Sequence, residues 1–336
     1  MYKIRIAKNK EKQLEKHHPW VFTGAIDKVV PQFTTEDWAD VYSYDGTFIA
    51  KGWYDEKSHI VLHLLSWDED EVTDEEYVST LVKNAIIRRK DFFSLPNTNC
   101  FRLIHGEADF IPGVAADIYA KEVRIIISSR FALHFLLTIV ETIENTLHPS
   151  LIQVTADPFY ASSEKISENT RYFVKGKEVK ENEIKRENTL FMENGIWYEI
   201  APGRGQKSGF YCDQRNNREI AEKYMKGKDV LDICSYTGAF TLHALRAKAN
   251  SVLSVDSSES ALRHLLYQIH LNENKGTIDP LSRDKVKTVN ADCFNYIREV
   301  EEDKYDCIIL DPPKLAQTKS KLENAIKAYK DLNRVA

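Results

Sequence analysis

From about residue 210 onward, apolar runs of strand length alternate with stretches of helical length. Such alternation predicts a parallel β-sheet whose strands are joined by right-handed helical crossovers. We expect strands at 229–234, 251–256, 286–292 and 305–311, and helices at 213–226, 239–248, 258–273, 292–300 and 319–334. Ligands of such sheets bind beyond the carboxyl ends of the strands, so the loops after the strands are the expected functional site.

Each predicted strand has an aspartate at or near its carboxyl end: Asp232, Asp256, Asp292 and Asp311. Because the carboxyl ends of parallel strands meet at one edge, these carboxylates should form a cup of hydrogen-bond acceptors. Each acid taken alone could instead cap the helix that follows it. Their joint occurrence favours a ligand that is rich in hydrogen-bond donors.

The loop after the first strand, "CSYTGAF", has a single glycine, Gly238, whereas dinucleotide-binding loops have three. A phosphate cradle is therefore not expected, and the Thr-Gly pair can also be a simple helix start. Asp256 lies 18 residues beyond Gly238, where an acid can accept hydrogen bonds from both ribose hydroxyls. Asp292 and Cys293 lie where an adenine edge would approach. The pattern predicts a nucleoside cofactor without phosphates, of which S-adenosylmethionine is the commonest.

After the fourth strand the chain reads Asp311-Pro312-Pro313-Lys314. The two prolines fix the backbone, so that Asp311 and the peptide carbonyls present fixed acceptors to a flat, amine-bearing group. A base taken out of its stack is such a group. Enzymes that methylate the amino groups of DNA bases have an aromatic residue after the prolines, and here Lys314 stands in its place.

The first two hundred residues have a different pattern. Short strands separated by turns predict a small β-barrel or half-barrel over 1–67. An acidic run at 68–76 is typical of a solvated linker and the start of a helix, which we expect over 74–93. A mixed α and β region follows. It includes a helix at 131–147 and ends in a polar hairpin at about 172–198 that suits a connector.

Composition limits the function classes. The net charge of −5 excludes a generally basic nucleic-acid binder, and the five scattered cysteines suggest neither a disulfide framework nor a metal site. No apolar run is long enough to cross a membrane, and a cytoplasmic protein is expected. A local basic patch does occur among the first thirty residues. The N-terminal patch, as it is called below, comprises Lys8, Lys10, Lys12 and Trp20, which could bind RNA, although Trp20 could equally be a core residue.

Seven motifs, among them "CSYTGAF" and "SVDSS", resemble those of the RlmI-type large-subunit ribosomal RNA cytosine carbon-5 methyltransferases, and the likeness covers nearly the whole chain. "HHPWVFTGAI" is similar to the hallmark of their PUA RNA-binding domain, and "FRLIHGEADFIPGVAADIY" to that of their central domain. "GFYCDQRNNR", "DPPK" and "AYKDLNRVA" are similar to segments of their catalytic domain. The resemblance implies a PUA-like domain at 1–70, a central α+β domain at 71–190 and a Rossmann-like S-adenosylmethionine methyltransferase domain at 191–336.

The resemblance also implies roles for individual residues. S-adenosylmethionine would be the methyl donor and a cytosine of large-subunit ribosomal RNA the acceptor. Catalytic roles fall on Asp311, Pro312 and Lys314, and an RNA contact falls on Arg218, although surface pairing on its helix is an alternative. No metal is implied, and a homodimer is one option for the assembly. The implied cofactor residues are Gln214, Arg215, Asp232, Ser235, Tyr236, Gly238, Asp256, Ser257, Asp292, Cys293 and Asp311.

Carbon 5 of cytosine is not nucleophilic, so its methylation requires a thiolate that adds to carbon 6. In the family this cysteine lies on a later strand than the four predicted here. Among the cysteines present only Cys212 is conceivable as a substitute. We therefore expect a methyltransferase sheet that lacks its last strands and a truncated, inactive chain. The alternative is a non-catalytic RNA-binding remnant of such an enzyme.

Overall fold

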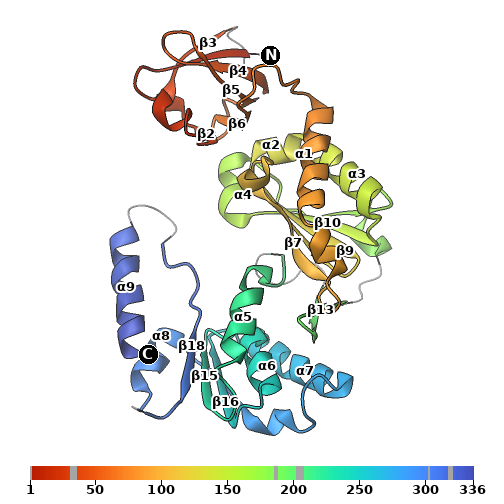
Figure 1. Cartoon of the computed structure of the whole chain (residues 1–336), viewed down its shortest axis with the longest axis vertical. Coiled ribbons are helices and arrows are strands. Elements are labelled where there is room, and N and C mark those ends of the chain that lie inside the picture. Colours follow the sequence, from red (N-terminus) through yellow and green to blue (C-terminus); the bar gives the residue numbers. More distant parts are fainter. Residues whose placement is uncertain (1, 31–35, 185–187, 202–207, 302, 317–320) are drawn as a thin grey trace. The chain divides into compact units, whose positions relative to one another are not determined.

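The computed structural model of the chain describes residues 2–30, 36–184, 188–201, 208–301, 303–316 and 321–336 (Figure 1). The chain divides into two compact units. Unit 1 comprises Met1–Thr189 and Ile200–Cys212, and unit 2 comprises Leu190–Glu199 and Asp213–Ala336. Unit 1 therefore contains the range predicted for the PUA-like domain and, except for residue 190, the range predicted for the central domain, and the three-part division stays a prediction.

The first sheet of unit 1 has the strand order β2-β6-β5-β4-β1-β3. Side chains of β1 alternate between buried and exposed, as expected for a strand with one face on the core. In β5 a Cβ atom on Gly52 would lie 2.3 Å from the carbonyl oxygen of His63, so only glycine fits there. The predicted β-rich N-terminal domain is confirmed. Its strands are β1 (Tyr2–Ile6), β2 (Trp20–Val21), β3 (Ile26–Val30), β4 (Asp37–Tyr42), β5 (Phe48–Tyr54) and β6 (Leu62–Ser66).

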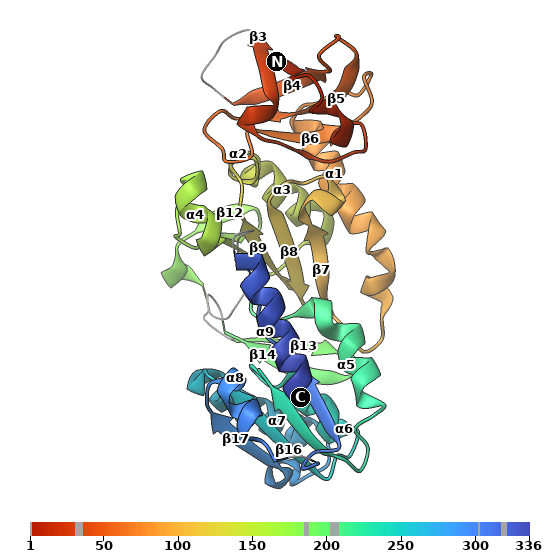
Figure 2. The same cartoon turned by 90° about the vertical axis from the view of Figure 1, so that its left-hand side faces the viewer.

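The second sheet of unit 1 has the order β12-β11-β10-β9-β8-β7, and helices α1 and α3 pack together beside it (Figure 2). Asp74 begins α1 by accepting a hydrogen bond from the backbone N–H of Tyr77 at 2.8 Å. The strands are β7 (Cys100–His105), β8 (Val114–Tyr119), β9 (Glu122–Ile127), β10 (Leu151–Ala156), β11 (Arg171–Val174) and β12 (Lys177–Val179); the helices are α1 (Glu75–Arg88), α2 (Arg130–His134), α3 (Leu136–Leu147) and α4 (Pro158–Glu164).

Three expectations for this region were wrong in detail. The helix expected over 74–93 ends at Arg88 and is followed by a 3-10 turn. The helix expected over 131–147 is interrupted at Phe135. The single polar hairpin expected at 172–198 is two separate hairpins. In the first, β11 and β12 join the second sheet of unit 1, and Tyr172 and Phe173 of β11 are buried. In the second, β13 (Thr189–Glu193) pairs with β14 (Ile196–Ile200). Residues 185–187 lie outside the described residues.

Unit 2 contains the predicted parallel sheet, with strand order β17-β16-β15-β18. Successive strands step outward from β15 to β17, and β18 then pairs with the other side of β15. The gap between the carboxyl ends of β15 and β18 is therefore a topological switch point, where α/β sheets bind ligands. The strands are β15 (Asp229–Ile233), β16 (Ser251–Asp256), β17 (Val286–Asn290) and β18 (Cys307–Leu310); the helices are α5 (Arg215–Glu222), α6 (Ala239–Arg246), α7 (Glu259–Lys275), α8 (Cys293–Tyr296) and α9 (Leu322–Val335).

All four predicted strands and the five predicted helices of this region are confirmed, except that residues 319 and 320, at the start of the last helix, lie outside the described residues. The sheet packs one face against α8 and α9, with Leu231, Val255 and Leu332 in one apolar cluster. On the opposite face Asp232 and Ser254 contact Thr241 of α6. The sheet thus holds its carboxyl edge between two layers of helices.

Candidate cofactor site at the carboxyl edge of the sheet

The loop between β15 and α6 has an unusual backbone. Cys234, Tyr236 and Gly238 have φ angles of 61°, 48° and 81°, in the left-handed region. A Cβ atom on Gly238 would lie 2.3 Å from Cγ of Leu265, so both its conformation and its surroundings require glycine. Non-glycine residues in this region store strain, which concentrates at ligand sites. The loop is therefore a candidate for holding a ligand.

Ser235 lies in the middle of this loop and is 7% exposed. Its hydroxyl oxygen is buried and has no hydrogen-bond partner among the described residues. A buried hydroxyl without a partner costs free energy, so it marks a place where a bound polar group would supply the missing hydrogen bond. This observation fits the predicted contact with S-adenosylmethionine.

Asp256 ends β16 and is joined to the same loop. Its Oδ2 accepts a hydrogen bond from the backbone N–H of Tyr236 at 2.9 Å, and its Oδ1 accepts one from Ser258 at 2.8 Å. Each carboxylate oxygen keeps a further lone pair, so Asp256 can still accept hydrogen bonds from two hydroxyls. Ser257, next to it, is exposed. The geometry fits a ribose at the end of β16.

Asp232 is 1% exposed and lies beneath the site. Its carboxylate accepts a hydrogen bond from Thr241 Oγ1 at 2.7 Å. Burial raises the pKa of Asp232 from 3.8 to about 7, the hydrogen bond from Thr241 opposes the shift, and the nearby charges of Asp311 and Asp256 add to it. The side chain of Asp232 thus points toward α6. It was predicted to contact the cofactor, but its carboxylate is not exposed at the carboxyl edge of the sheet.

Asp311 is connected to the start of α5. Gln214 Nε2 donates a hydrogen bond to Asp311 Oδ1 at 3.1 Å, while Gln214 Oε1 accepts one from Asn217 Nδ2 at 2.6 Å. The side chain of Gln214 therefore spans the switch point beside β18. Arg215 next to it is half-buried and donates a hydrogen bond to Asn216 Oδ1 at 3.2 Å. Sequence reasoning missed Asn217, since an asparagine in a helix carries no distinguishing pattern.

The proline loop after β18 is held by α9. The hydroxyl of Tyr329 donates a hydrogen bond to the carbonyl of Pro313 at 3.3 Å and accepts one from the backbone N–H of Leu315 at 3.2 Å. Pro312 is half-buried, and Lys314 is exposed. The loop thus presents Lys314 to solvent from a fixed backbone, and sequence reasoning missed the supporting role of Tyr329.

Asp292 and Cys293 lie after β17. Asp292 Oδ1 accepts a hydrogen bond from the backbone N–H of Asn295 at 2.9 Å, which makes it the N-cap of α8. Its carboxylate is exposed, so the cap does not consume all of its acceptors. Cys293 is buried, and its Sγ donates to the carbonyl of Val255 at 3.5 Å. Asp292 therefore caps the helix that follows it, which was the alternative to a ligand contact. A contact with adenine stays a prediction.

Arg218 requires a correction, because its predicted RNA contact is wrong. Its side chain is 2% exposed and forms two hydrogen bonds with Glu193, from Nε at 2.8 Å and from Nη2 at 2.9 Å. Burial raises the pKa of Glu193, and Arg218 opposes this shift. The pair joins α5 to the hairpin β13–β14. A buried ion pair of this kind is structural, because solvent and RNA phosphates do not reach it.

The N-terminal patch lies in unit 1. Lys8, Lys10 and Lys12 are exposed, and Trp20 is 39% exposed with its Nε1 donating to Glu107 Oε1 at 3.0 Å. Trp20 is therefore a surface residue. The lysines are accessible to an anionic ligand, and RNA binding by the patch stays a prediction.

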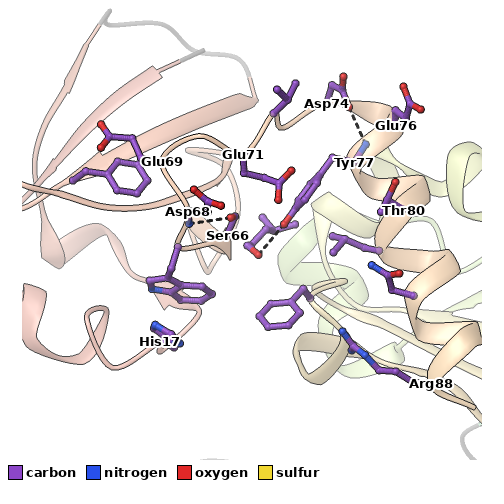
Figure 3. A pocket seen from close by; sticks show the side chains of 17 residues that line it. His17, Ser66, Asp68, Glu69, Glu71, Asp74, Glu76, Tyr77, Thr80 and Arg88 are labelled. Carbon is purple, nitrogen blue, oxygen red and sulfur yellow. Dashed lines mark hydrogen bonds between the residues drawn. The ribbon is translucent and has the colours of Figure 1, made fainter.

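A separate cavity of about 860 Å³ lies in unit 1, between the first sheet and α1 (Figure 3). Its wall includes Trp67, Tyr77 and Phe110, and its rim carries carboxylates from the acidic run that precedes α1. Several like charges at the rim would repel RNA phosphates. We therefore place the functional site at the carboxyl edge of the unit 2 sheet and treat the cavity as a solvated recess. The acidic lining residues are Asp68, Glu69, Glu71, Asp74 and Glu76.

The described ranges contain neither a membrane-spanning helix nor a cluster of metal ligands. No helix among them is long and apolar enough to cross a membrane. No group of three or more His, Cys, Asp or Glu side chains in the same ranges is arranged to hold a metal ion.

Comparisons with known proteins agree with this geometry. A PUA-like domain model matches residues 4–67, and an S-adenosylmethionine-dependent methyltransferase model matches residues 135–334. Ribosomal RNA large subunit methyltransferase I of Vibrio vulnificus (strain YJ016) is 32% identical over 335 residues, which cover 99% of this chain and 81% of that protein. The protein of the same name from Vibrio cholerae serotype O1 (strain O395) is 30% identical over 335 residues, with the same coverage.

Solved structures show the same fold. A chain from Streptococcus mutans assigned as a SAM-dependent methyltransferase aligns with a TM-score of 0.74 and 21% identity, covering 97% of this chain and 82% of that one. A methyltransferase structure complexed with SAH aligns with a TM-score of 0.77 and 21% identity, covering 98% and 83%. The matching methyltransferase model depends on S-adenosylmethionine, the cofactor that the sequence predicts. The chain belongs to the S-adenosylmethionine-dependent methyltransferases, in the family of the ribosomal RNA large subunit methyltransferase I proteins.

Proposed function

We propose that the chain carries the cofactor-binding and RNA-recognition parts of a methyltransferase that acts on carbon 5 of a cytosine in large-subunit ribosomal RNA. The names of the relatives support ribosomal RNA of the large subunit as the substrate. The resemblance of the motifs to the RlmI-type enzymes supports cytosine carbon 5. The observation that carries the proposal is the hydrogen bond between Gln214 and Asp311 beside the proline loop, at the switch point of the sheet.

The cofactor contacts belong to the same proposal. S-adenosylmethionine, when bound, supplies an electrophilic methyl group. Asp256 accepts hydrogen bonds from the ribose hydroxyls, and Ser235 donates one to a polar group of the cofactor. The buried Asp232 stabilises the loop from below. Tyr236, Gly238, Ser257, Asp292, Cys293 and Arg215 complete the proposed cofactor surface.

The base contacts follow from the proline loop. Asp311 and the carbonyls around Pro312 hold the amine-bearing edge of the cytosine, and Gln214 fixes the orientation of Asp311. Lys314 is exposed and contacts a phosphate next to the base. RNA binding is shared with the N-terminal patch of a PUA-like domain at 1–70. The proposed central domain comprises 71–190, and the proposed methyltransferase domain comprises 191–336.

The cysteines present favour a second function for the 336 residues taken by themselves. Cys100 is buried in unit 1, and Cys212 of the same unit contacts the hydroxyl of Tyr119 at 3.9 Å. Cys307 is part of β18, where burial raises its pKa. Cys293 is buried in the apolar cluster beside β16, and Cys234 packs against the same cluster. In none of these contacts is a thiol held as a nucleophile, so we propose that these residues alone bind cofactor and RNA without methyl transfer.

The test is a radiolabelled methyl-transfer assay on unmodified large-subunit ribosomal RNA, with small-subunit RNA as the negative control. The Vibrio vulnificus relative is the positive control and should label carbon 5 of a cytosine. The 336-residue chain should bind the RNA and incorporate no label. If the chain labels cytosine efficiently, the placement of the nucleophile is wrong, and Cys212→Ala becomes the informative variant. If the relative labels a different base or atom, the cytosine proposal fails.

A further inference from the structure

Asn217 is connected to the proline loop through Gln214. The two residues are three positions apart at the start of α5, so their side chains project from the same face of the helix. Gln214 is the N-cap of α5, yet its side chain makes no capping hydrogen bond among the described residues and turns to Asp311, to which Nε2 donates at 3.1 Å. Asn217 Nδ2 donates to Gln214 Oε1 at 2.6 Å. The three side chains form a hydrogen-bond relay from the surface of α5 to the end of β18.

The direction of the hydrogen bonds in the relay is fixed at its inner end. An ionised carboxylate only accepts hydrogen bonds, so the amide N–H group of Gln214 must face Asp311. The amide oxygen of Gln214 then faces outward and needs a donor, which the amide nitrogen of Asn217 supplies. A side chain at 217 that only accepts would require the reverse orientation of Gln214, with its oxygen against Asp311. The side chain at 217 therefore influences what Asp311 offers to a ligand.

The orientation of the relay matters for the choice between two pyrimidines. Cytosine carries an amine on carbon 4, which donates hydrogen bonds, whereas uracil carries an oxygen there, which accepts them. A carboxylate held as an acceptor favours cytosine and repels the uracil oxygen. If the oxygen of Gln214 faced Asp311, two acceptors would oppose each other, and the carboxyl group would turn away or take up a proton. In either case Asp311 would no longer exclude uracil.

We propose that Asn217 is a positioning residue, which holds the relay in the orientation that selects cytosine over uracil at Asp311. The inference rests on the base contact of Asp311 proposed above, and it adds the group that determines the selectivity of that contact. Asn217 is exposed and Gln214 is half-buried, so the relay lies at the rim of the switch point and does not support the core. A change at Asn217 should therefore alter base selectivity while the fold is kept.

Three substitutions separate the orienting role from a merely structural one. Asn217→Asp keeps the shape of the side chain and removes the donor, whereas Asn217→Ala removes the whole amide. Asn216→Asp is the matched control, because Asn216 is exposed on the same helix and its Oδ1 accepts a hydrogen bond from Arg215 Nε, which an aspartate would also accept. A structural role makes alanine at least as harmful as aspartate at 217. The relay requires the opposite order, because alanine leaves Gln214 free to keep its N–H group toward Asp311.

The affinities for two nucleotides measure the selectivity. Cytidine 5′-monophosphate and uridine 5′-monophosphate are titrated by NMR into the full 336-residue chain saturated with S-adenosylhomocysteine. The parent and Asn216→Asp should bind the cytidine nucleotide about tenfold more tightly, as one hydrogen bond made or lost would give. Asn217→Asp should bind the two nucleotides equally within about twofold, and Asn217→Ala should keep a preference of at least about fivefold. An undiminished preference in Asn217→Asp, or a larger loss in Asn217→Ala, would overturn the proposal.

The relay itself is followed by the side-chain amide signal of Gln214 in a chain labelled with ¹⁵N-glutamine, where Gln214→Met identifies the signal. Asp311→Ala and Asn217→Asp should each shift this signal, because each removes one of the two hydrogen bonds of the amide, and Asn216→Asp should leave it in place. A signal that neither substitution moves refutes the relay. If the parent binds neither nucleotide, the proposed base contact fails and the selectivity with it, and the amide signal still decides whether Asn217 orients Gln214.

Discussion

Replacing Asp232 by asparagine should make unit 2 more stable at neutral and higher pH. The folded protein raises the pKa of Asp232 from 3.8 to about 7, so between these values the folded chain holds a proton that the unfolded chain has released. Stability therefore falls as pH rises through this window, by about 1.4 kcal/mol per pH unit and by roughly 4 kcal/mol in total. Asparagine has the same shape, keeps an acceptor for Thr241 Oγ1 and has no charge to bury.

The assay is urea unfolding of unit 2 at pH 5, 6, 7 and 8, followed by pulse proteolysis with mass spectrometric detection of fragments from 213–336. The difference in the free energy of unfolding between Asp232→Asn and the parent should increase from pH 5 to pH 7 by about 2–3 kcal/mol and then level off. Other titrating groups cancel in this difference. Asp284→Asn, at an exposed position, controls for the loss of one negative charge. A difference that stays constant from pH 5 to pH 8 would refute the reasoning.

Three other predictions concern the cofactor, the RNA and the buried ion pair. Asp256→Ala should weaken S-adenosylhomocysteine binding by at least ~1.5 kcal/mol in calorimetry, because a charged acceptor is lost; equal affinities would exclude the ribose contact. Changing the three lysines of the N-terminal patch to glutamate should lower affinity for a large-subunit RNA fragment and flatten its salt dependence, and unchanged binding would dismiss the patch. Glu193→Ala should lower the free energy of unfolding by about 3–5 kcal/mol in urea titrations, because the buried guanidinium of Arg218 loses its carboxylate; a cost under about 1 kcal/mol would contradict this.

The parallel sheet of unit 2 could be predicted because local pattern and tertiary fold agree there. Each strand is an apolar run with an aspartate at or near its end. Locating the runs in the sequence therefore also located Asp256 and Asp311. Gly238 was recognisable as a helix start, but the contact with Leu265 that requires it depends on a helix far along the chain. Local sequence carries no information about such partners.

Long-range partners also explain the wrong predictions. The charges of Arg218 and Glu193 look solvated in sequence, but each neutralises the other in the interior across 25 residues. In the sequence Asp232 resembles the aspartates at the ends of the other strands. Side chains alternate between the two faces of β15, however, and that of Asp232 lies on the face that α6 covers. The sequence does not show which face α6 covers. The hairpin predicted at 172–198 was wrong for the same reason. Each of its strands contains a charged residue, so the sequence does not indicate that β11 and β12 join one sheet while β13 and β14 form another.

The route of the chain between the units has a consequence for biosynthesis and for cleavage. The chain passes from one unit to the other after Thr189, after Glu199 and again after Cys212. Unit 1 is not complete until Ser208 has been made, because the Ser208 hydroxyl bonds to the hydroxyl of Tyr119 at 2.8 Å and its carbonyl accepts from Arg124 at 3.2 Å. On the ribosome the first unit must therefore wait for a segment that follows part of the second. A single proteolytic cut at any of these three crossings would separate the two segments of at least one unit onto different fragments.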